Sequence, residues 1–179
     1  MKAPAFVRTL IFLMCAATSA AAVPAQTLEG LWQGYDGELL HSSRQLIELA
    51  EAIPAEKYSW RPAPGVRSTS EVYLHIALTN YYLLQVTGPK VPADLDFKME
   101  KTVTSKPEVI AWLKKSLEAV KTAHLAETPE DLKRAVKIHK IDATVDGMYL
   151  RILVHANEHM GQLVAYARMN DVVPPWSKE

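Results

Sequence analysis

Apolar residues recur along four segments of the chain with the three- and four-residue spacing of an amphipathic helix. These segments cover residues 28–53, 69–87, 105–126 and 144–169. Four helices of this length, each with an apolar stripe, predict an all-α protein in which the helices pack as a four-helix bundle. The stripe of the first helix consists of Leu28, Trp32, Tyr35, Leu39, Ser42, Leu46, Leu49 and Ile53, with Ser42 as its one polar member.

Local signals predict where the helices begin and end. Pro54 ends the first helix, and Gly88 followed by a proline ends the second. Ser68 and Glu71 have the spacing of a capping box, which predicts that the second helix begins at Thr69.

The segments between the helices constrain the topology. Residues 54–67 and 88–104 are long connections, so a bundle with at least one crossover is favoured over a simple up-down-up-down path. Residues 128–130 predict one short helical turn, and residues 136–141 alternate as an extended strand would. The fourth helix is apolar on almost every face, which predicts central burial or coverage by a partner chain.

The N-terminus has the three-part pattern of a secretory signal. Lys2 and Arg8 precede a short apolar run at residues 10–17, and small residues lead to a cleavage site after Ala25. Residues 1–25 are therefore predicted to be a signal peptide, residues 26–179 the single domain, and the mature protein secreted or periplasmic. Attachment of lipid at Cys15 is the less favoured alternative, because Met14 is a poor residue before a lipidated cysteine.

Composition excludes several classes of function. Without residues 1–25 the chain keeps 18 of its 20 Lys and Arg and all 20 Asp and Glu, so no excess of positive charge favours nucleic acid. No basic amphipathic segment favours a membrane after signal cleavage. Cys15 is the one cysteine, so the mature domain has neither a disulfide nor a thiol nucleophile.

Three histidines predict a metal site. His155 and His159 are four residues apart, so their imidazoles share one face of the fourth helix, and His75 lies within the second helix. Three converging imidazoles are a usual ligand set for a divalent cation with an open coordination position. Gln162 and Tyr166 continue the face of the two histidines.

Other interpretations of these histidines remain open. A buried histidine is usually a hydrogen-bonded core residue, and a pair spaced four apart arises by chance in many helices. His155 to His159 also matches the inverted zinc-protease signature, with Glu158 as general base, but such proteases need a larger domain and a further acidic ligand. The remaining histidines are expected to be structural or exposed, namely His41, His124 and His139.

Longer motifs around these histidines resemble the DinB-like (DinB/YfiT) family. The first half of the resemblance consists of Tyr58-Ser-Trp60-Arg61-Pro62-Ala-Pro-Gly65-Val-Arg-Ser68 and Glu71-Val-Tyr-Leu-His75-Ile-Ala. The second half consists of His155-Ala-Asn-Glu-His159-Met-Gly161-Gln162-Leu-Val-Ala-Tyr166-Ala-Arg168-Met-Asn170 and Val173-Pro-Pro-Trp176. Asp171 departs from the glycine that members often have after the last helix.

The resemblance implies an up-down-down-up bundle, often paired as a homodimer, with a zinc or nickel ion held by His75, His155 and His159. Members with known activity resemble thiol-dependent transferases and isomerases, although the export signal weakens the expectation of a cytosolic thiol.

We therefore favour an exported metal-dependent enzyme that acts on a small-molecule substrate by hydrolysis or group transfer. Glu158, Tyr82 and Gln162 are the candidates for proton transfer, orientation or support of the ligands. Two alternatives are a non-catalytic protein that binds a metal or small ligand, closed by a fourth ligand such as His41 or His124, and an interaction module that pairs through the fourth helix.

Overall fold

The computed structural model describes residues 30–177, so the predicted signal peptide at 1–25 lies outside the described part. Four long helices dominate it: α1 (Tyr35–Ala52), α2 (Thr69–Thr87), α4 (Lys106–Ala126) and α6 (Val145–Met169). The short elements are η1 (Ala55–Lys57), α3 (Met99–Thr102), α5 (Pro129–Leu132), β1 (Ala135–Ile138), β2 (Ile141–Thr144) and η2 (Pro175–Ser177). Within these residues, no helix combines the length and the apolar character that crossing a bilayer requires.

The mostly helical class is confirmed, but the expectation of an all-α chain needs one correction. Strands β1 and β2 pair antiparallel, with Ala135 opposite Thr144 and Ile138 opposite Ile141. The hairpin packs against α2 and α6 at the end of the molecule where α6 begins.

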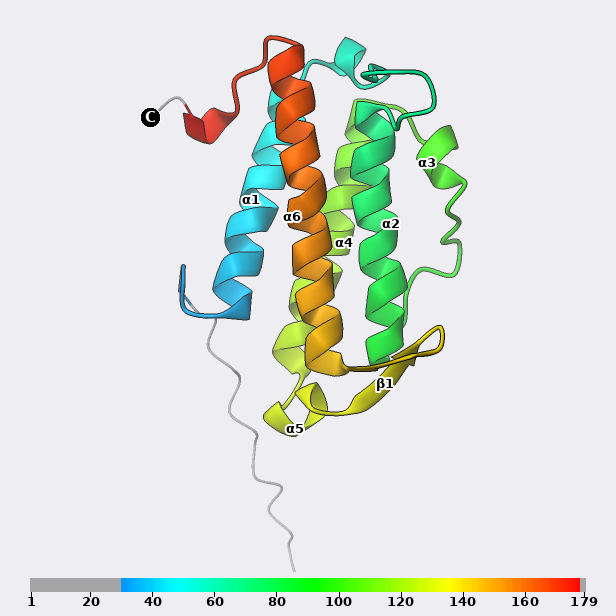
Figure 1. Ribbon diagram of the computed structural model, residues 1–179, viewed down its shortest axis with the longest axis vertical. Coiled ribbons are helices and arrows are strands. Elements are labelled where there is room, and N and C mark those ends of the chain that lie inside the picture. Colours follow the sequence, from blue (N-terminus) through cyan, green and yellow to red (C-terminus); the bar gives the residue numbers. More distant parts are fainter. Residues whose placement is uncertain (1–29, 178–179) are drawn as a thin grey trace, which may run out of the picture.

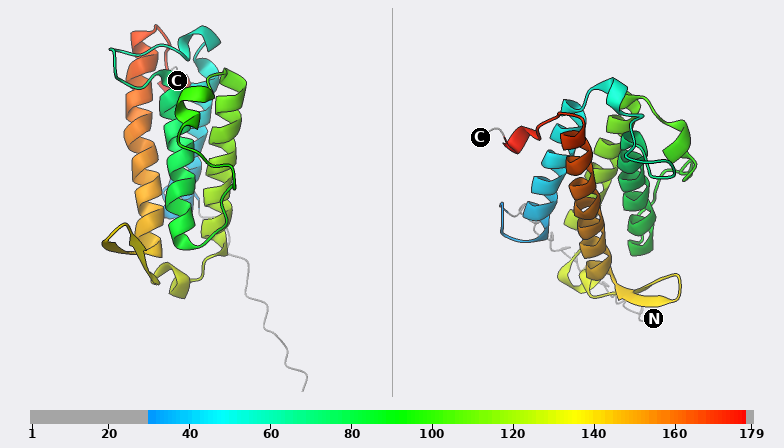
Figure 2. Two further views of the ribbon diagram at one scale, coloured as in Figure 1. Left: turned by 90° about the vertical axis from the view of Figure 1, so that its right-hand side faces the viewer. Right: turned by 45° about the horizontal axis from the view of Figure 1, so that its top comes forward.

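The long helices lie side by side (Figure 1). Helix α2 packs against both α4 and α6, and α1 packs against the same two helices from the other side. In this view α1 and α6 run upward, whereas α2 and α4 run downward. The connection at residues 88–104 therefore returns along the length of α2 before α4 begins, which Figure 2 (left) shows from the side.

The core between these helices has two parts. One surrounds Leu46, Leu74, Leu113 and Leu163, and the other surrounds Leu84 and its neighbours at the opposite end of the bundle. Some buried polar groups are paired across helices. Ser42 Oγ, the polar position in the stripe of α1, donates to Asn157 Oδ1 of α6 at 3.0 Å.

Helix α2 has the predicted boundaries. Ser68 accepts a hydrogen bond from the Glu71 backbone N–H, and the Glu71 carboxylate accepts one from the Ser68 backbone N–H, which completes the capping box. Gly88 ends the helix at φ 116°, a conformation that glycine adopts at little cost. Because His75 lies two turns into this helix, these ends also fix its position.

Helix α1 is shorter than the apolar spacing predicts. Trp32 has a φ of 64° in a turn before the helix and is 68% exposed, so it is not part of the buried stripe. Gly34, at φ 142°, separates this turn from the helix. The turn folds over the first helical residues, where a Cβ atom on Gly37 would lie 2.0 Å from the Gly30 carbonyl oxygen.

Helix α6 is not centrally buried in the single chain, so of the two predicted alternatives only coverage by a partner chain remains. Leu150 is 55% exposed and Val154 is 40% exposed, so this helix is not enclosed on all sides by the described chain. Helix α2 is the more completely buried of the two, because α3 and the hairpin cover it in addition to α4 and α6. Its least buried side carries His75, Thr79 and Tyr82.

Candidate metal centre

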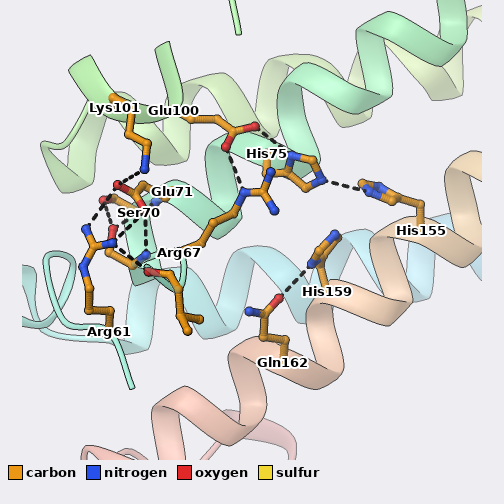
Figure 3. Close-up of polar contacts among 12 residues, drawn as sticks. Arg61, Arg67, Ser70, Glu71, His75, Glu100, Lys101, His155, His159 and Gln162 are labelled. Carbon is orange, nitrogen blue, oxygen red and sulfur yellow. Dashed lines mark hydrogen bonds and ion pairs between the residues drawn. The ribbon is translucent and has the colours of Figure 1, made fainter. Parts of the chain in front are cut away.

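Helices α2 and α6 bring the three predicted histidines together. His75 projects from α2, and His155 and His159 project toward it from successive turns of α6 (Figure 3). One potential donor atom from each ring lies within 4.8 Å of the other two. Among residues 30–177, these three form the group of histidine, cysteine and acidic residues spaced to hold a cation.

The closest pair already has the spacing of two ligands. His75 Nε2 and His155 Nε2 are 3.2 Å apart. Two nitrogens that bind one tetrahedral zinc at about 2.0–2.1 Å lie roughly 3.4 Å from each other. The ring centroids of His159 lie 4.8 Å from His75 and 4.6 Å from His155, so the third imidazole borders the same space.

A carboxylate orients the imidazole of His75. Glu100, on α3, accepts a hydrogen bond from His75 Nδ1 at 2.7 Å and another from Arg67 Nε at 2.9 Å. Because an anionic carboxylate can only accept, the proton of neutral His75 lies on Nδ1 and its Nε2 carries the lone pair. Burial raises the pKa of Glu100, but the bonds from Arg67 and His75 outweigh it and leave the pKa below its ordinary value.

A second chain of hydrogen bonds orients His159. The Arg67 carbonyl oxygen can only accept, so it receives the proton of the Tyr166 hydroxyl at 3.2 Å. That hydroxyl oxygen accepts from Gln162 Nε2 at 2.8 Å, which turns Gln162 Oε1 toward His159 Nδ1 at 2.9 Å. His159 Nδ1 must therefore carry the proton, and its Nε2 is the free donor atom.

Burial keeps two of the imidazoles neutral. It is the largest cause of the low pKa of His155, about 4, and the neighbouring charges of His159 and His75 lower it further. Burial also lowers the pKa of His75 and outweighs the opposite effect of the bond to Glu100. Neutral imidazole is the form that ligates a metal, so the donor set fits a divalent metal cation.

The structure places the three candidates for catalysis in different surroundings. Gln162 forms a hydrogen bond with one histidine of the cluster, His159. Glu158 lies on α6 between the two histidine turns, half-exposed, and both its oxygens accept from Arg151 at 3.2 and 2.6 Å. The Tyr82 hydroxyl forms a 3.0 Å hydrogen bond with His139 in the hairpin turn.

Sequence reasoning missed Glu100 and the role of Arg67. Glu100 belongs to the connection at residues 88–104, where no periodicity indicates which side chain turns inward. Arg67 directly precedes Ser68, the N-cap of α2. This position next to a capping box was the one sequence signal that the main chain of Arg67 would be held in place.

The other histidines that the structure describes lie elsewhere. His124 is buried and bonds to Asp36 at 2.7 Å, which connects the end of α4 to the beginning of α1. His41 packs against Trp32 at a ring distance of 5.1 Å, and His139 occupies the hairpin turn. Neither His41 nor His124 belongs to the group that could hold a cation.

Comparisons with known proteins agree with this architecture. The sequence model that describes the DinB superfamily matches residues 38–163, which is more than half of the chain. The chain belongs to the DinB superfamily. No curated protein matches it significantly.

Two solved DinB-like proteins share the fold. A DinB-like protein from Bacillus cereus superposes with a TM-score of 0.68 at 21% identity, over 78% of this chain and 94% of that one. A DinB-like protein from Bacillus subtilis gives a TM-score of 0.59 at 20% identity, over 75% of this chain and 90% of that one. At these identities the likeness concerns the DinB fold alone.

Proposed function

We propose that this DinB-superfamily protein is a metal-dependent enzyme that uses His75, His155 and His159 to hold one divalent cation, zinc or nickel. Its scaffold is an up-down-down-up four-helix bundle with a crossover at residues 88–104, in keeping with the helix directions in Figure 1. The cation would supply Lewis acidity, which lowers the pKa of a water or thiol and polarises a substrate for hydrolysis or group transfer.

The observation that carries the proposal is the pair of hydrogen-bonded chains behind the histidines. Glu100 holds His75 and Gln162 holds His159 with Nδ1 as donor, which leaves an Nε2 lone pair on each ring. A histidine that merely fills a core needs no such arrangement, whereas partners of this kind are typical behind metal-binding imidazoles.

Four residues around this centre have proposed roles. Glu100 fixes the proton position of His75, and Gln162 does the same for His159. Glu158 remains a proposal for proton transfer, since it would first have to separate from Arg151. Tyr82 remains a proposal for contact with a small-molecule substrate at the hairpin side of the site.

Metal content tests the centre. Purified protein should contain about one zinc or nickel per chain, and His75→Ala and His159→Ala should each lose most of it, because two imidazoles bind a cation much more weakly than three. His139→Ala, which changes a histidine outside the cluster, is the matched control. Equal sub-stoichiometric metal in all four proteins would refute the proposed centre.

A spectroscopic titration separates an enzyme from a storage protein. Cobalt-substituted protein should change its visible spectrum when a small thiol is added, because three histidines leave a coordination position for an exogenous ligand. A spectrum that no added thiol or anion alters would favour the alternative, a non-catalytic metal-binding bundle.

We further propose that the protein acts after export, in the secreted or periplasmic space, and that residues 1–25 are removed. This rests on the signal pattern of the sequence. Mass spectrometry of the exported protein should give a mature chain that begins at Gln26.

We also propose that the protein forms a homodimer through the exposed apolar side chains of α6, such as Leu150 and Val154.

A further inference from the structure

Arg67 stands where the two chains of hydrogen bonds behind the histidines meet. Its side chain connects to His75 through Glu100, with Nε 2.9 Å from Glu100 Oε2. Its backbone carbonyl connects to His159 through Tyr166 and Gln162. One residue is therefore held by both its main chain and its side chain beside the candidate centre.

The loop that carries Arg67 is braced as well. Arg61 Nη1 donates to the Val66 carbonyl at 2.7 Å, and the guanidinium of Arg61 also contacts Glu71. On the other side, Ser68 is fixed by its capping bonds. The guanidinium of Arg67 is thus set in place before any ligand arrives, which reduces the entropy lost on binding.

The donor edge of Arg67 is uncommitted. Nε donates to Glu100, and within residues 30–177 neither Nη atom makes a hydrogen bond. The side chain is 41% exposed, so a solute can reach it. In Figure 3 the guanidinium lies next to the imidazole ring of His75, and its charge lowers the pKa of His75.

The other cations around the centre are occupied. Lys101 bonds to Glu71 at 3.1 Å, as does Arg61 at 3.2 Å, and both Nη atoms of Arg151 bond to Glu158. Arg67 is therefore the cationic group near the histidines that offers free, directed donors in the described part of the chain.

We infer that Arg67 is the substrate-recognition residue of the proposed enzyme, and that its Nη atoms bind a carboxylate of a small anionic substrate whose reacting end lies at the three histidines. The inference rests on the proposed function. The two Nη donors of one guanidinium match the two oxygens of a planar carboxylate.

The local charge supports an anion. The carboxylate of Glu100 balances Arg67, and imidazoles bind a metal in their neutral form. With a divalent cation bound, the centre would carry a net positive charge that an anionic substrate would neutralise.

Binding of matched thiols tests the inference. Thioglycolate and 3-mercaptopropionate are compared with the neutral thiols 2-mercaptoethanol and 3-mercapto-1-propanol by calorimetric titration of the zinc-loaded protein. At least one acid should bind about tenfold or more tightly than its neutral partner, as expected for charge-assisted hydrogen bonds. Arg67→Gln should abolish the preference and Arg67→Lys should retain part of it, because lysine keeps the charge without the fork.

The control is Lys101→Gln, which removes one positive charge from the same region and should leave the preference within about twofold. Metal content is measured in every sample. Stoichiometric zinc without any preference for the acids in the unaltered protein would overturn the role of Arg67 and leave the metal centre intact. Absence of stoichiometric zinc would overturn both, and an equal loss of preference in Lys101→Gln would reduce the effect to general electrostatics.

Discussion

Two of the three histidines of the candidate metal centre have a neighbour that decides which nitrogen carries the proton. For His75 that neighbour is Glu100, whose carboxylate is buried and already bonded to Arg67. For His159 it is Gln162, which Tyr166 orients in turn. These two imidazoles are therefore oriented without a bound cation, at the cost of burying a charged group.

Glu100→Gln should weaken metal binding without removing a ligand. The amide is neutral, so the imidazole of His75 becomes a poorer donor, and affinity for zinc should fall by about tenfold to a hundredfold. Competition with a chromophoric chelator measures this change. Glu108→Gln, on an exposed carboxylate of α4, should leave the affinity unaltered, and an equal affinity in Glu100→Gln would contradict the role assigned to Glu100.

The metal-free protein should lose stability in acid because of His155. Folding lowers the pKa of its imidazole from 6.5 to about 4, so the unfolded state binds more protons between these limits. The free energy of unfolding should therefore fall as the pH drops from about 6.5 toward 4, by on the order of 3 kcal/mol, and this loss should be complete below that range.

Urea unfolding in the presence of a chelator at several pH values measures this dependence. His155→Ala should show a flatter slope between pH 6.5 and 4, although the burial of His75 contributes in the same direction. An identical slope in both proteins would contradict the assignment to His155.

At the scale of single residues the sequence predicted the cluster of three histidines, but not the residues that orient two of them. Helical spacing alone puts His155 and His159 on one face. Glu100 could not be found this way, because its contact depends on how a connection without periodicity folds back over α2.

Among the elements, α2 was predictable at both ends because its signals are local. The capping bonds of Ser68 and the positive φ of Gly88 involve only residues within a few positions of one another. The start of α1 was predicted too early, since Leu28 and Trp32 continue the apolar spacing while Gly34 interrupts the helix through its backbone conformation. The apolar periodicity depends on the side chains alone, so it does not detect a break that lies in the backbone conformation.

The end of α6 carries a strain that a substitution can relieve. Asp171 has a φ of 60°, in the left-handed region, and its backbone N–H bonds to the Arg168 carbonyl at 3.2 Å. Asp171→Gly should raise the free energy of unfolding by about 0.5–1 kcal/mol, because glycine adopts this conformation without a Cβ penalty. Asp171→Ala, which removes the same carboxylate but keeps the Cβ atom, should give no gain, and thermal unfolding of the three proteins distinguishes these outcomes.

For the whole molecule, the centre joins two helices that are distant in sequence. His75 and His155 are 80 residues apart, and α2 and α6 also pack directly against each other. A cation bound only by the folded state should therefore stabilise the entire domain.

Zinc at about a hundred times its dissociation constant should add roughly 2.7 kcal/mol and raise Tm by about 5–10 °C. Differential scanning calorimetry with and without a chelator measures the shift. It should disappear in His75→Ala and persist in His139→Ala, and a Tm that chelation does not change would argue against a cation held by the fold.

The general architecture was also predictable, because four periodic segments and two long connections exclude most alternatives. Contacts between elements were not. The sequence could not indicate that α3 and the hairpin would cover α2, or decide between central burial of α6 and a side of α6 left uncovered in a single chain. Those outcomes depend on how the connections pack, which leaves no regular pattern along the chain.

The match to the DinB superfamily stops short of one residue that this protein needs. It ends at residue 163, whereas Tyr166 lies nearly one helical turn beyond. A fragment cut to the family boundaries would keep all three histidines but lose the hydroxyl that turns Gln162 toward His159. Such a trimmed fragment would bring every ligand to the centre with one of them free to rotate, so any recombinant version meant for metal studies should extend past the end of α6.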